Sequence, residues 1–354
     1  MLPPSGSLQP DTEAYDLFTR KEEYAAAGLD ERGRFARALC ANQDILDPVV
    51  SRLLVERGYR PTYPDGKAFA LCLTHDVDDI YPPLTHIALS SLYCARAFNF
   101  SQMARQVLWK LNRRWPSPYL NFRRIMALES RYHARSTFYF MATERDVHRF
   151  RYRIEDLQPE LRHIVENGWD VGLHTGYYSF DNMPGLAAEK QRLEQALGRE
   201  IIGCRNHFLR FRVPNTWELL SQAGFKYDTT FGYHDGIGFR NGMCHPFRPV
   251  NRDSGREIDI VEIPMAVMDA TLFQGANLDT GFSRMKDLIG RVETCHGVLT
   301  VDWHNAAWDN PARQKYAALY ESMLDYCGAR NGWLTSADEI YRWFSGSGHQ
   351  KPPT

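Results

Sequence analysis

The residues of this chain best suited to chemistry stand at the end of an apolar stretch. Residues 69–73 are apolar and are followed at once by His75, Asp76, Asp78 and Asp79. A strand buried on both faces has this apolar pattern, and in a parallel α/β sheet its last side chains reach a pocket. Carboxylates there can act as general bases or as ligands of a divalent cation. Either role needs partners from other strand ends.

Ionisable residues also end three later strand-like stretches. They are His174 after residues 169–173, Arg205 and His207 at the end of residues 201–205, and Asp302 and His304 after residues 297–301. Because active-site side chains gather where parallel strands end, we expect these residues close to the first acidic cluster. Carboxylates and imidazoles together would bind a divalent metal and leave one carboxylate as base and one histidine as acid.

Strand-like and helical stretches alternate along most of the chain. Further short strands are predicted at residues 136–141, 224–228, 258–263 and 262–268. Helices are predicted within residues 85–135, over residues 157–164 and from Pro184 to Gly198. This alternation predicts an α/β fold with a parallel sheet or barrel. Asp269, at the exit of one predicted strand, either faces the pocket or caps a turn.

Three parts are expected along the chain. Residues 1–66 form an N-terminal arm and helical cap, which has Ile45, Val49 and Leu53 at helical spacing. Residues 67–345 form the barrel, with a helical insertion around residues 85–130. Residues 346–354 are a flexible tail.

The amino-acid composition limits the classes of function that this chain can have. The 354 residues include 42 basic and 43 acidic ones, so the overall charge favours neither nucleic acid nor an anionic membrane. Seven scattered cysteines without a CxxC pair favour reduced thiols over a disulfide framework or a zinc knuckle. No segment approaches the ~20 apolar residues of a membrane span, and no signal-like start is visible. These features predict a cytoplasmic protein without a transmembrane segment or a nucleic-acid partner, and they leave the oligomeric state open.

One local run departs from this charge balance. The run from Lys110 to Arg114, with basic residues at positions 110, 113 and 114, lies between Trp109 and Trp115. The run would suit an acidic glycan or a lipid phosphate, or it is the solvated face of an amphipathic helix.

Four motifs occur in a set order. They are Leu73-Thr-His-Asp76-Val-Asp78, Gly172-Leu-His174-Thr, Gly203-Cys-Arg205-Asn-His207 and Val301-Asp-Trp-His304-Asn. In this order they resemble the motifs of the NodB-type polysaccharide deacetylases, carbohydrate esterase family four, over about residues 68–345. The resemblance implies a distorted (β/α) barrel that uses a divalent metal, most often Zn²⁺, to hydrolyse N- or O-acyl groups on sugars.

The resemblance also implies roles for individual residues. In that family the first motif supplies a base and a metal-binding aspartate, which in one branch are separated by one residue, as here. Asp76 is then the implied base and Asp78 the implied ligand, with His174 as a second ligand. His304 would protonate the leaving amine, and Arg205 would keep Asp76 ionised and oriented.

One position departs from the family pattern. The second motif normally has two histidines four residues apart, and four residues after His174 this chain has Tyr178. Three outcomes are open. His207 replaces the missing ligand, the metal is held weakly by Asp78, His174 and waters, or the site has lost its metal chemistry.

Aromatic and arginine side chains are expected to hold the substrate. Phe208 stands where the family often has tyrosine, and Tyr178 and Arg210 lie close to the motifs. Residues 227–248, which include Tyr233 and Arg240, suit a loop over the barrel mouth. Aromatic faces stack on sugar rings, and arginines bind carboxylates or phosphates. A packed loop with buried aromatic residues is the alternative.

We therefore expect a metal-dependent deacylase that acts on a saccharide, such as an acetamido sugar of a surface-glycan precursor. A second hypothesis is hydrolysis of a non-sugar amide on the same barrel. A third is a catalytically silent barrel that binds glycans, which the tyrosine at position 178 would explain.

Overall fold

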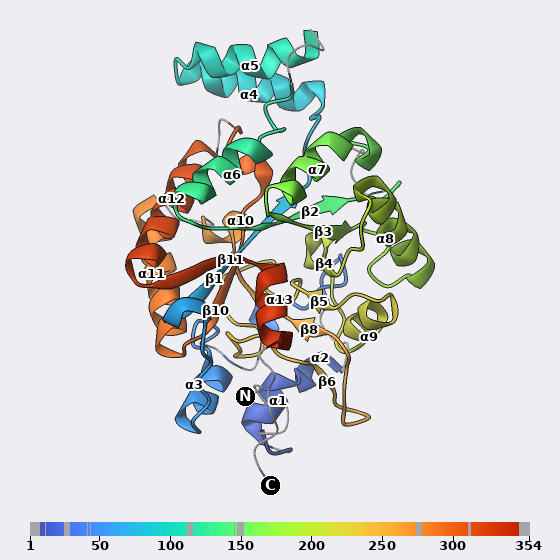
Figure 1. The fold of residues 1–354 in the computed structure, drawn as a ribbon, viewed down its shortest axis with the longest axis vertical. Helices are drawn as coiled ribbons and strands as arrows, with labels where there is room; N and C mark the ends of the chain where they lie inside the picture. Colours follow the sequence, from blue (N-terminus) through green and yellow to red (C-terminus); the bar gives the residue numbers. More distant parts are fainter. Residues whose placement is uncertain are drawn as a thin grey trace.

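The computed structural model describes residues 8–10, 12–24, 29–40, 42, 44–111, 116–144, 146, 152–273, 278–310 and 313–346. A nine-stranded sheet forms its centre, and all of its pairings are parallel (Figure 1). The order is β8 (Val261–Glu262), β5 (Tyr227–Asp228), β4 (Gly203–Asn206), β3 (Asp170–Thr175), β2 (Thr137–Met141), β1 (Phe69–Val77), β10 (Val298–Asp302) and β9 (Met265–Met268), while β11 (Gly332–Ser336) also pairs with β1. A separate antiparallel pair joins β6 (Val250–Asn251) to β7 (Arg256–Glu257).

β1 is the strand around which the sheet is arranged. All nine of its residues are buried, as expected for a strand covered on both faces. It pairs with β11 at Phe69–Leu73, with β10 at Ala70–Thr74 and with β2 at Thr74–Val77. These three neighbours fix the backbone of the strand up to the point where its acidic side chains begin.

Helices cover the curved sheet and confirm the predicted distorted (β/α) barrel (Figure 1). They are α6 (Phe122–Arg131), α7 (Gln158–Glu166), α8 (Met183–Leu197), α9 (Asn215–Gln222), α10 (Asp269–Leu272), α11 (Leu278–Thr294), α12 (Gln314–Ala329) and α13 (Ala337–Gly346). Their amphipathic spacing explains how they pack. In α6, for example, the buried residues Phe122, Ile125, Met126 and Glu129 recur every three or four positions.

Two glycines make room for large side chains among the strands. A Cβ atom on Gly172 would lie 2.4 Å from the ring of Tyr139, and one on Gly203 would lie 2.0 Å from the ring of Tyr227. Both tyrosines are fully buried, so these positions tolerate no side chain without repacking.

The N-terminal segment is attached to the barrel by buried charges. Its helices are α1 (Glu13–Phe18), α2 (Lys21–Tyr24) and α3 (Val49–Glu56). Arg20 is fully buried, donates to the carbonyl oxygen of Arg240 at 2.6 Å and pairs with Glu23 at 2.7 Å. Glu23 in turn accepts from the Arg240 guanidinium. The division of the chain at residue 66 stays a prediction.

The predicted insertion contains a helical hairpin that projects from the barrel (Figure 1). Its helices are α4 (Leu84–Arg96) and α5 (Phe100–Leu111). The predicted tail lies almost wholly outside the described residues, as does most of the basic run at 110–114 with Trp115.

The strand predictions hold best for the buried, central strands. β2, β3, β4 and β10 fall where the sequence places strands, whereas β5 and β8 are two residues long each. β11 was missed, because five residues with Trp333 and Thr335 between two helical stretches carry no strong strand pattern.

Two other expectations can be compared with the coordinates. All seven cysteines lie within the described ranges, are buried and form no disulfide. Among the helices that the structure describes, none is long and apolar enough to cross a bilayer.

Two buried carboxyl groups, Asp228 on β5 and Glu262 on β8, hydrogen bond to each other at the edge of the sheet. Burial raises the pKa of both, and the charge of Asp228 raises the pKa of Glu262 further. Glu262 also accepts from the Trp217 indole at 2.7 Å and from the Phe231 backbone N–H at 3.3 Å. The pair is therefore stable only while it retains a proton.

This pair predicts a pH-dependent stability. The carboxyl groups of Asp228 and Glu262 have higher pKa values in the folded than in the unfolded protein, so they stabilise the fold at low pH. This stabilisation is lost as the pH rises through their pKa values in the folded protein. Glu262→Gln keeps an acceptor oxygen and removes one ionisation. We expect its free energy of unfolding, measured by urea denaturation at several pH values, to fall less with rising pH than that of the wild type. The exposed Glu166→Gln is the matched control, and parallel pH curves for all three proteins would contradict the prediction.

Candidate metal and catalytic centre

The strand ends bring the predicted site residues together. β1 supplies Asp76, and Asp78 follows directly after its end. β3 supplies His174, β4 and the turn after it supply Arg205 and His207, and β10 and the residues after it supply Asp302 and His304. These strands are neighbours in the order β4-β3-β2-β1-β10, so their carboxyl ends form one continuous edge. The arrangement that the strand-end pattern predicted is present.

Asp78, His174 and His207 form a group of three that could hold a metal ion. Nε2 of His174 lies 3.3 Å from Oδ1 of Asp78, and Nε2 of His207 lies 3.9 Å from the same oxygen. His174 and His207 are 1% and 8% exposed, so both rings are held in a largely water-free environment. Of the three outcomes open for the missing histidine, this geometry favours His207 as the replacement.

Hydrogen bonds orient both imidazole rings. Nδ1 of His174 donates to the carbonyl oxygen of Arg205 at 3.0 Å, and Nδ1 of His207 lies 3.2 Å from a carboxylate oxygen of Asp146. Without a cation, burial disfavours the charged ring, but Asp76 and Asp78 outweigh it and raise the pKa of His174 to about 9. With a cation bound, each ring would keep its proton on Nδ1 and present the lone pair of Nε2 on the side of Asp78. Asp146 escaped the sequence analysis because it follows β2 by five residues in a segment without a recognisable motif.

The residues present fit a divalent metal. Oδ1 of Asp78 is buried, has no well-aligned hydrogen-bond donor among the described residues and lies 3.3 Å from Nε2 of His174, as one ligand atom lies beside another. Two imidazole nitrogens with one carboxylate oxygen are a donor set that suits Zn²⁺. With bonds of about 2.0–2.2 Å, neighbouring ligand atoms of a tetrahedral zinc site lie roughly 3.3–3.6 Å apart. The observed spacings of 3.3 and 3.9 Å need only small adjustments.

Arg205 holds Asp76 in place. Its Nη1 donates to Oδ1 of Asp76 at 3.0 Å and to the Thr74 hydroxyl at 2.7 Å, and its guanidinium carbon lies 4.8 Å from the centre of the Tyr139 ring. Burial alone would raise the pKa of Asp76, but the charge of Arg205, helped by His174 and His304, lowers it. Asp76 is thus a buried carboxylate that stays ionised.

Asp302 connects Asp76 to the end of β10. Its Oδ1 accepts from the Asp76 backbone N–H at 3.1 Å and lies 3.2 Å from Nη1 of Arg205. Burial and the charge of Asp76 raise the pKa of Asp302 to about 7. The sequence placed Asp302 at a strand end and assigned it no role, whereas the structure makes it a partner of both Asp76 and Arg205.

His304 is oriented by Asp269, the first residue of α10. Nδ1 of His304 lies 2.8 Å from Oδ1 of Asp269, whose other oxygen accepts from the His304 backbone N–H at 3.2 Å. Burial opposes the charged imidazolium, but Asp269 and Asp302 outweigh it and raise the pKa of His304 well above its usual value. Nε2 of His304 lies 3.7 Å from Oδ2 of Asp78, so the ring faces the proposed metal position. Of the two sequence alternatives for Asp269, the pocket-facing one is correct.

His207 lies at the start of a turn whose next two residues have left-handed backbone angles, with φ of 60° at Phe208 and 53° at Leu209. Non-glycine residues adopt this conformation at an energetic cost that surrounding contacts must offset. The N-terminal segment provides such contacts. Arg34 donates to the Phe208 carbonyl oxygen at 3.0 Å, and the Arg32 guanidinium lies 4.2 Å from the Phe208 ring centre.

The predicted substrate-binding residues near this turn are already engaged within the protein. The Phe208 ring stacks on His207 at 4.1 Å, meets the Tyr177 ring edge-on at 5.8 Å and lies against the Arg32 guanidinium. The Arg210 guanidinium lies between the rings of Tyr177 and Phe180, at 4.1 and 3.8 Å. Tyr178 is 43% exposed and is the predicted substrate contact with the most accessible ring.

The prediction that Tyr233 and Arg240 bind the substrate is wrong. Both are 2% exposed, and they belong to the buried cluster that attaches the N-terminal segment to the barrel. Arg240 pairs with Glu23, and the Tyr233 hydroxyl contacts the sulfur of Cys40 at 3.1 Å. A substrate cannot reach either side chain, so the alternative of a packed loop with buried aromatic residues holds for this pair.

His75 of the first cluster lies outside the metal group. Its Nδ1 donates to the Trp303 carbonyl oxygen at 2.6 Å, and its Nε2 lies 2.9 Å from Glu129. Glu129 also accepts from Ser136, Trp169 and Tyr320. This fully buried network holds β1 against β10 and α6, which is a packing role.

If Asp78, His174 and His207 bind the metal, the loss of any one of them should weaken metal binding. Single Asp78→Ala, His174→Ala and His207→Ala variants should each lower Zn²⁺ affinity, measured by competition with a chromogenic chelator, by about a hundredfold or more. His163→Ala, which changes a histidine on α7, is the matched control. Wild-type affinity in His207→Ala would show that His207 is not a ligand.

Removing the charge of Asp146 should lower the Zn²⁺ affinity less than removing a ligand does. Asp146→Asn weakens the hold on Nδ1 of His207 but leaves all three ligands in place, so we expect a loss of about 10–100-fold. The exposed Asp156→Asn removes a similar charge from the same stretch of chain and should leave the affinity unchanged. Equal losses in the two variants would mean that the effect is one of net charge rather than ring orientation.

Comparisons with known proteins bear on the fold. No protein-family model matches the sequence, and no curated protein matches it. Among solved structures, a protein named as a polysaccharide deacetylase from Mycobacterium smegmatis is similar with a TM-score of 0.55 and 18% identity, over 83% of this chain and 98% of that one. Another named as a polysaccharide deacetylase, from Pseudomonas aeruginosa PAO1, gives a TM-score of 0.54 and 16% identity, over 84% and 99%. This chain therefore has the polysaccharide deacetylase fold that its four motifs predicted.

Proposed function

We propose that the protein is a metal-dependent deacylase that removes an acyl group, such as N-acetyl, from a sugar of a glycan or glycan precursor. The observation that carries the proposal is the convergence of three imidazoles on one partly buried carboxylate. Nε2 of His174, His207 and His304 lies 3.3, 3.9 and 3.7 Å from the oxygens of Asp78. We assign two of these rings, His174 and His207, as ligands and the third, His304, as an acid.

Asp78, His174 and His207 would hold the divalent cation, for which Zn²⁺ is the best match. When bound, the cation supplies Lewis acidity towards the acyl carbonyl oxygen and makes water a stronger acid. The remaining steps belong to side chains of this chain.

Asp76 is the proposed general base. Its Oδ1 is taken by Arg205 at 3.0 Å, and its Oδ2 lies 3.6 Å from Nε2 of His174, on the side of the proposed metal. The carboxylate can therefore accept a proton from a water molecule in the site while Arg205 prevents it from rotating away. Asp302 supports the same geometry through the Asp76 backbone N–H.

His304 is the proposed general acid. Asp269 accepts from Nδ1, so the transferable proton is the one on Nε2, which faces the site. The acidic neighbours keep the ring protonated until the amine leaves. A base and an acid from two different strands can thus act on opposite sides of one acyl carbon.

The saccharide part of the proposal has separate support. The two similar structures are named as polysaccharide deacetylases, and the half-exposed Tyr178, four residues after His174 in the chain, offers an aromatic face on which a sugar ring can stack. Both are reasons for choosing acetylated sugars as the first substrates to test.

Asp76→Asn and His304→Ala test the mechanism. Because general acid–base groups contribute about 10²–10⁴-fold, each variant should lower kcat on an N-acetylated oligosaccharide by that factor while Zn²⁺ stays bound. Glu166→Gln on α7 is the matched control. Acetate release and metal content are measured on the same samples, with small non-sugar amides as the comparison substrates. Turnover that survives Asp76→Asn, or that needs no metal, would overturn the mechanism, and faster turnover of the amides would overturn the substrate class.

A further inference from the structure

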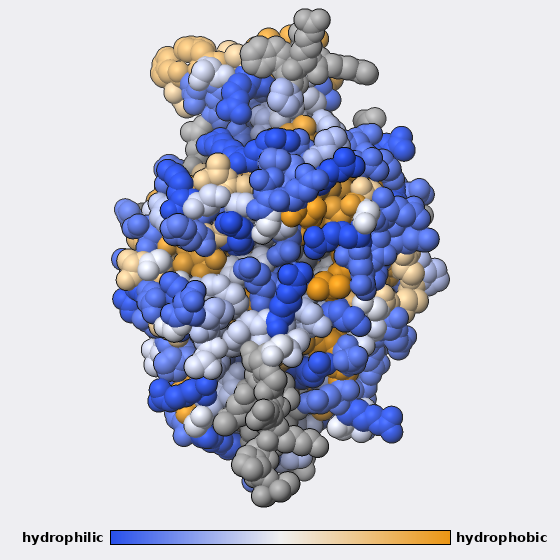
Figure 2. All heavy atoms as spheres, viewed as in Figure 1, coloured by the Kyte–Doolittle hydropathy of each residue, from blue (hydrophilic) through white to orange (hydrophobic). Residues whose placement is uncertain are grey.

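The α4–α5 hairpin exposes apolar side chains that the rest of the molecule keeps inside. Seven of the ten large apolar residues that are exposed in the described part of the chain lie between residues 84 and 111. They are Leu84, Leu89, Leu92 and Tyr93 on α4, Phe98 between the helices, and Phe100 and Leu111 on α5. Their exposed fractions run from 50% to 82%. Figure 2 shows apolar surface on this projection.

α5 is oriented with its apolar face away from the barrel, which is the opposite of the usual orientation of a surface helix. Apolar residues recur at positions 100, 103, 104, 107, 108 and 111, which is one face of a helix, and none of them is buried. The buried residues of α5 are instead Gln106 and Trp109. A surface helix normally turns its apolar stripe towards the core, whereas α5 leaves Phe100, Ala104 and Leu111 exposed and the other three positions of its stripe only partly buried.

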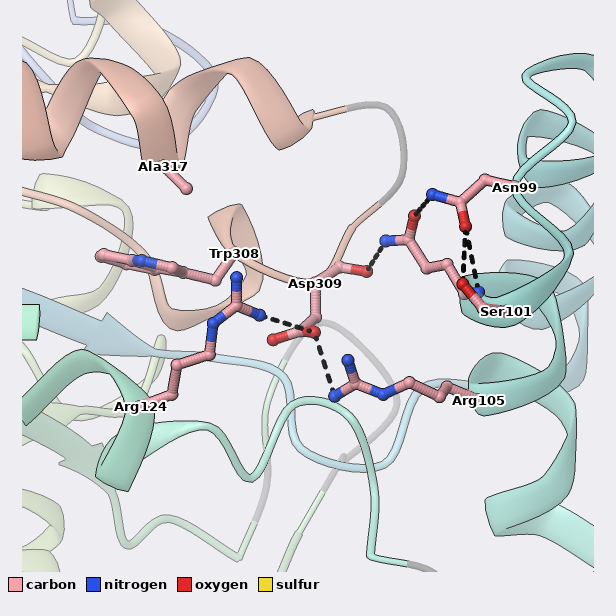
Figure 3. A pocket seen from close by; sticks show the side chains of 8 residues that line it. Asn99, Ser101, Arg105, Arg124, Trp308, Asp309 and Ala317 are labelled. Atoms are coloured by element: carbon pink, nitrogen blue, oxygen red, sulfur yellow. Dashed lines mark hydrogen bonds and ion pairs between the residues drawn. The ribbon is translucent and has the colours of Figure 1, made fainter. Parts of the chain in front are cut away.

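Polar contacts explain why α5 takes this orientation. Figure 3 shows the pocket between the hairpin and the barrel, where Arg105 and Arg124 both reach Asp309. Arg105 lies 3.5 Å from Oδ1 of Asp309, and Gln102 and Gln106 donate to the Asp309 carbonyl oxygen at 3.2 and 2.8 Å. The polar face of α5 is thereby attached to the barrel, and the apolar face must point away from it.

The charge of the hairpin points to the kind of partner. Residues 84 to 111 contain no Asp or Glu, and their three basic residues are Arg96, Arg105 and Lys110, of which Arg105 pairs with Asp309. Arg96 at the end of α4 and Lys110 near the end of α5 are both exposed, and the Lys110 ammonium lies 4.5 Å from the Trp109 ring centre. Leu, Phe and Trp combined with Lys and Arg are the composition of helices that lie in the interface of an anionic bilayer.

A second copy of this chain is a weaker candidate for the partner. A two-fold symmetric contact through the hairpin would bring Arg96 and Lys110 of one copy towards the same residues of the other, since such interfaces use the same patch on both subunits. The hairpin has no acidic side chain to compensate that repulsion. Anionic lipid headgroups supply the missing negative charge.

We propose that the α4–α5 hairpin binds the surface of an anionic lipid bilayer, with its apolar side chains in the headgroup region. Leu84 follows Asp78 by only six residues, so the hairpin is attached at the edge of the sheet that carries the proposed active site. A bound barrel would therefore hold that edge near the membrane. The proposal does not depend on the deacylase activity.

Flotation of the full chain with lipid vesicles tests the proposal. We expect binding to vesicles that mix phosphatidylglycerol with phosphatidylcholine, weak binding to phosphatidylcholine alone, and loss of binding as the salt concentration rises. Leu92→Glu with Phe100→Glu, and separately Arg96→Ala with Lys110→Ala, should each lower the partition coefficient by about tenfold or more. Leu39→Glu changes an exposed leucine outside the hairpin, at 47% exposure, and should bind like the wild type.

Further measurements separate membrane binding from other causes. The changed side chains are exposed, so thermal unfolding midpoints should match the wild type and exclude misfolding. Wild-type protein that fails to bind the anionic vesicles, or hairpin variants that bind as well as Leu39→Glu, would overturn the proposal. A wild-type dimer in light scattering that Leu92→Glu with Phe100→Glu converts to a monomer, without vesicle binding by either, would overturn it in favour of a contact between copies.

Discussion

Negative charge concentrated at one edge of a buried sheet is the constraint that the rest of the structure satisfies. Asp76, Asp78, Asp269 and Asp302 are at most about a quarter exposed, and carboxylates in such surroundings are costly unless they are paired. Arg205 neutralises Asp76 and Asp302 from within the barrel, and His304 faces Asp269. Oδ1 of Asp78 and Oδ2 of Asp302 are both buried without a hydrogen-bond donor among the described residues, and only Asp78 lies beside both His174 and His207. We propose that a divalent cation would balance the remaining negative charge at Asp78.

The same constraint explains features far from the acidic cluster. Arg205 needs space inside the barrel, where it lies over the Tyr139 ring, and Tyr139 fits because Gly172 on the next strand has no side chain. His207 needs a turn with two left-handed residues, and Arg32 and Arg34 of the N-terminal segment contact that turn. The segment expected as a cap is therefore also a support for a proposed metal ligand.

Much of the fold and part of the site could be predicted from sequence. The long apolar strand β1 and the residues at strand ends follow from local pattern, because a buried parallel strand needs apolar residues and its end brings polar ones to the pocket. Asp146 and the pairing of Asp269 with His304 depend on contacts across tens of residues, which no local pattern records. Tyr233 and Arg240 were misassigned for the same reason, since their burial depends on Arg20 and Glu23 more than 200 residues away. β11 was missed because its neighbour β1, rather than its own sequence, makes it a strand.

The central claim is that His207 takes the place of the histidine that position 178 lacks. X-ray absorption spectroscopy of the zinc-loaded full chain tests it most directly, because imidazole rings give a recognisable multiple-scattering signal. The account predicts two imidazole nitrogens at about 2.0–2.1 Å and oxygen ligands for the remainder of the shell. A shell with a single imidazole, or with sulfur, would contradict it.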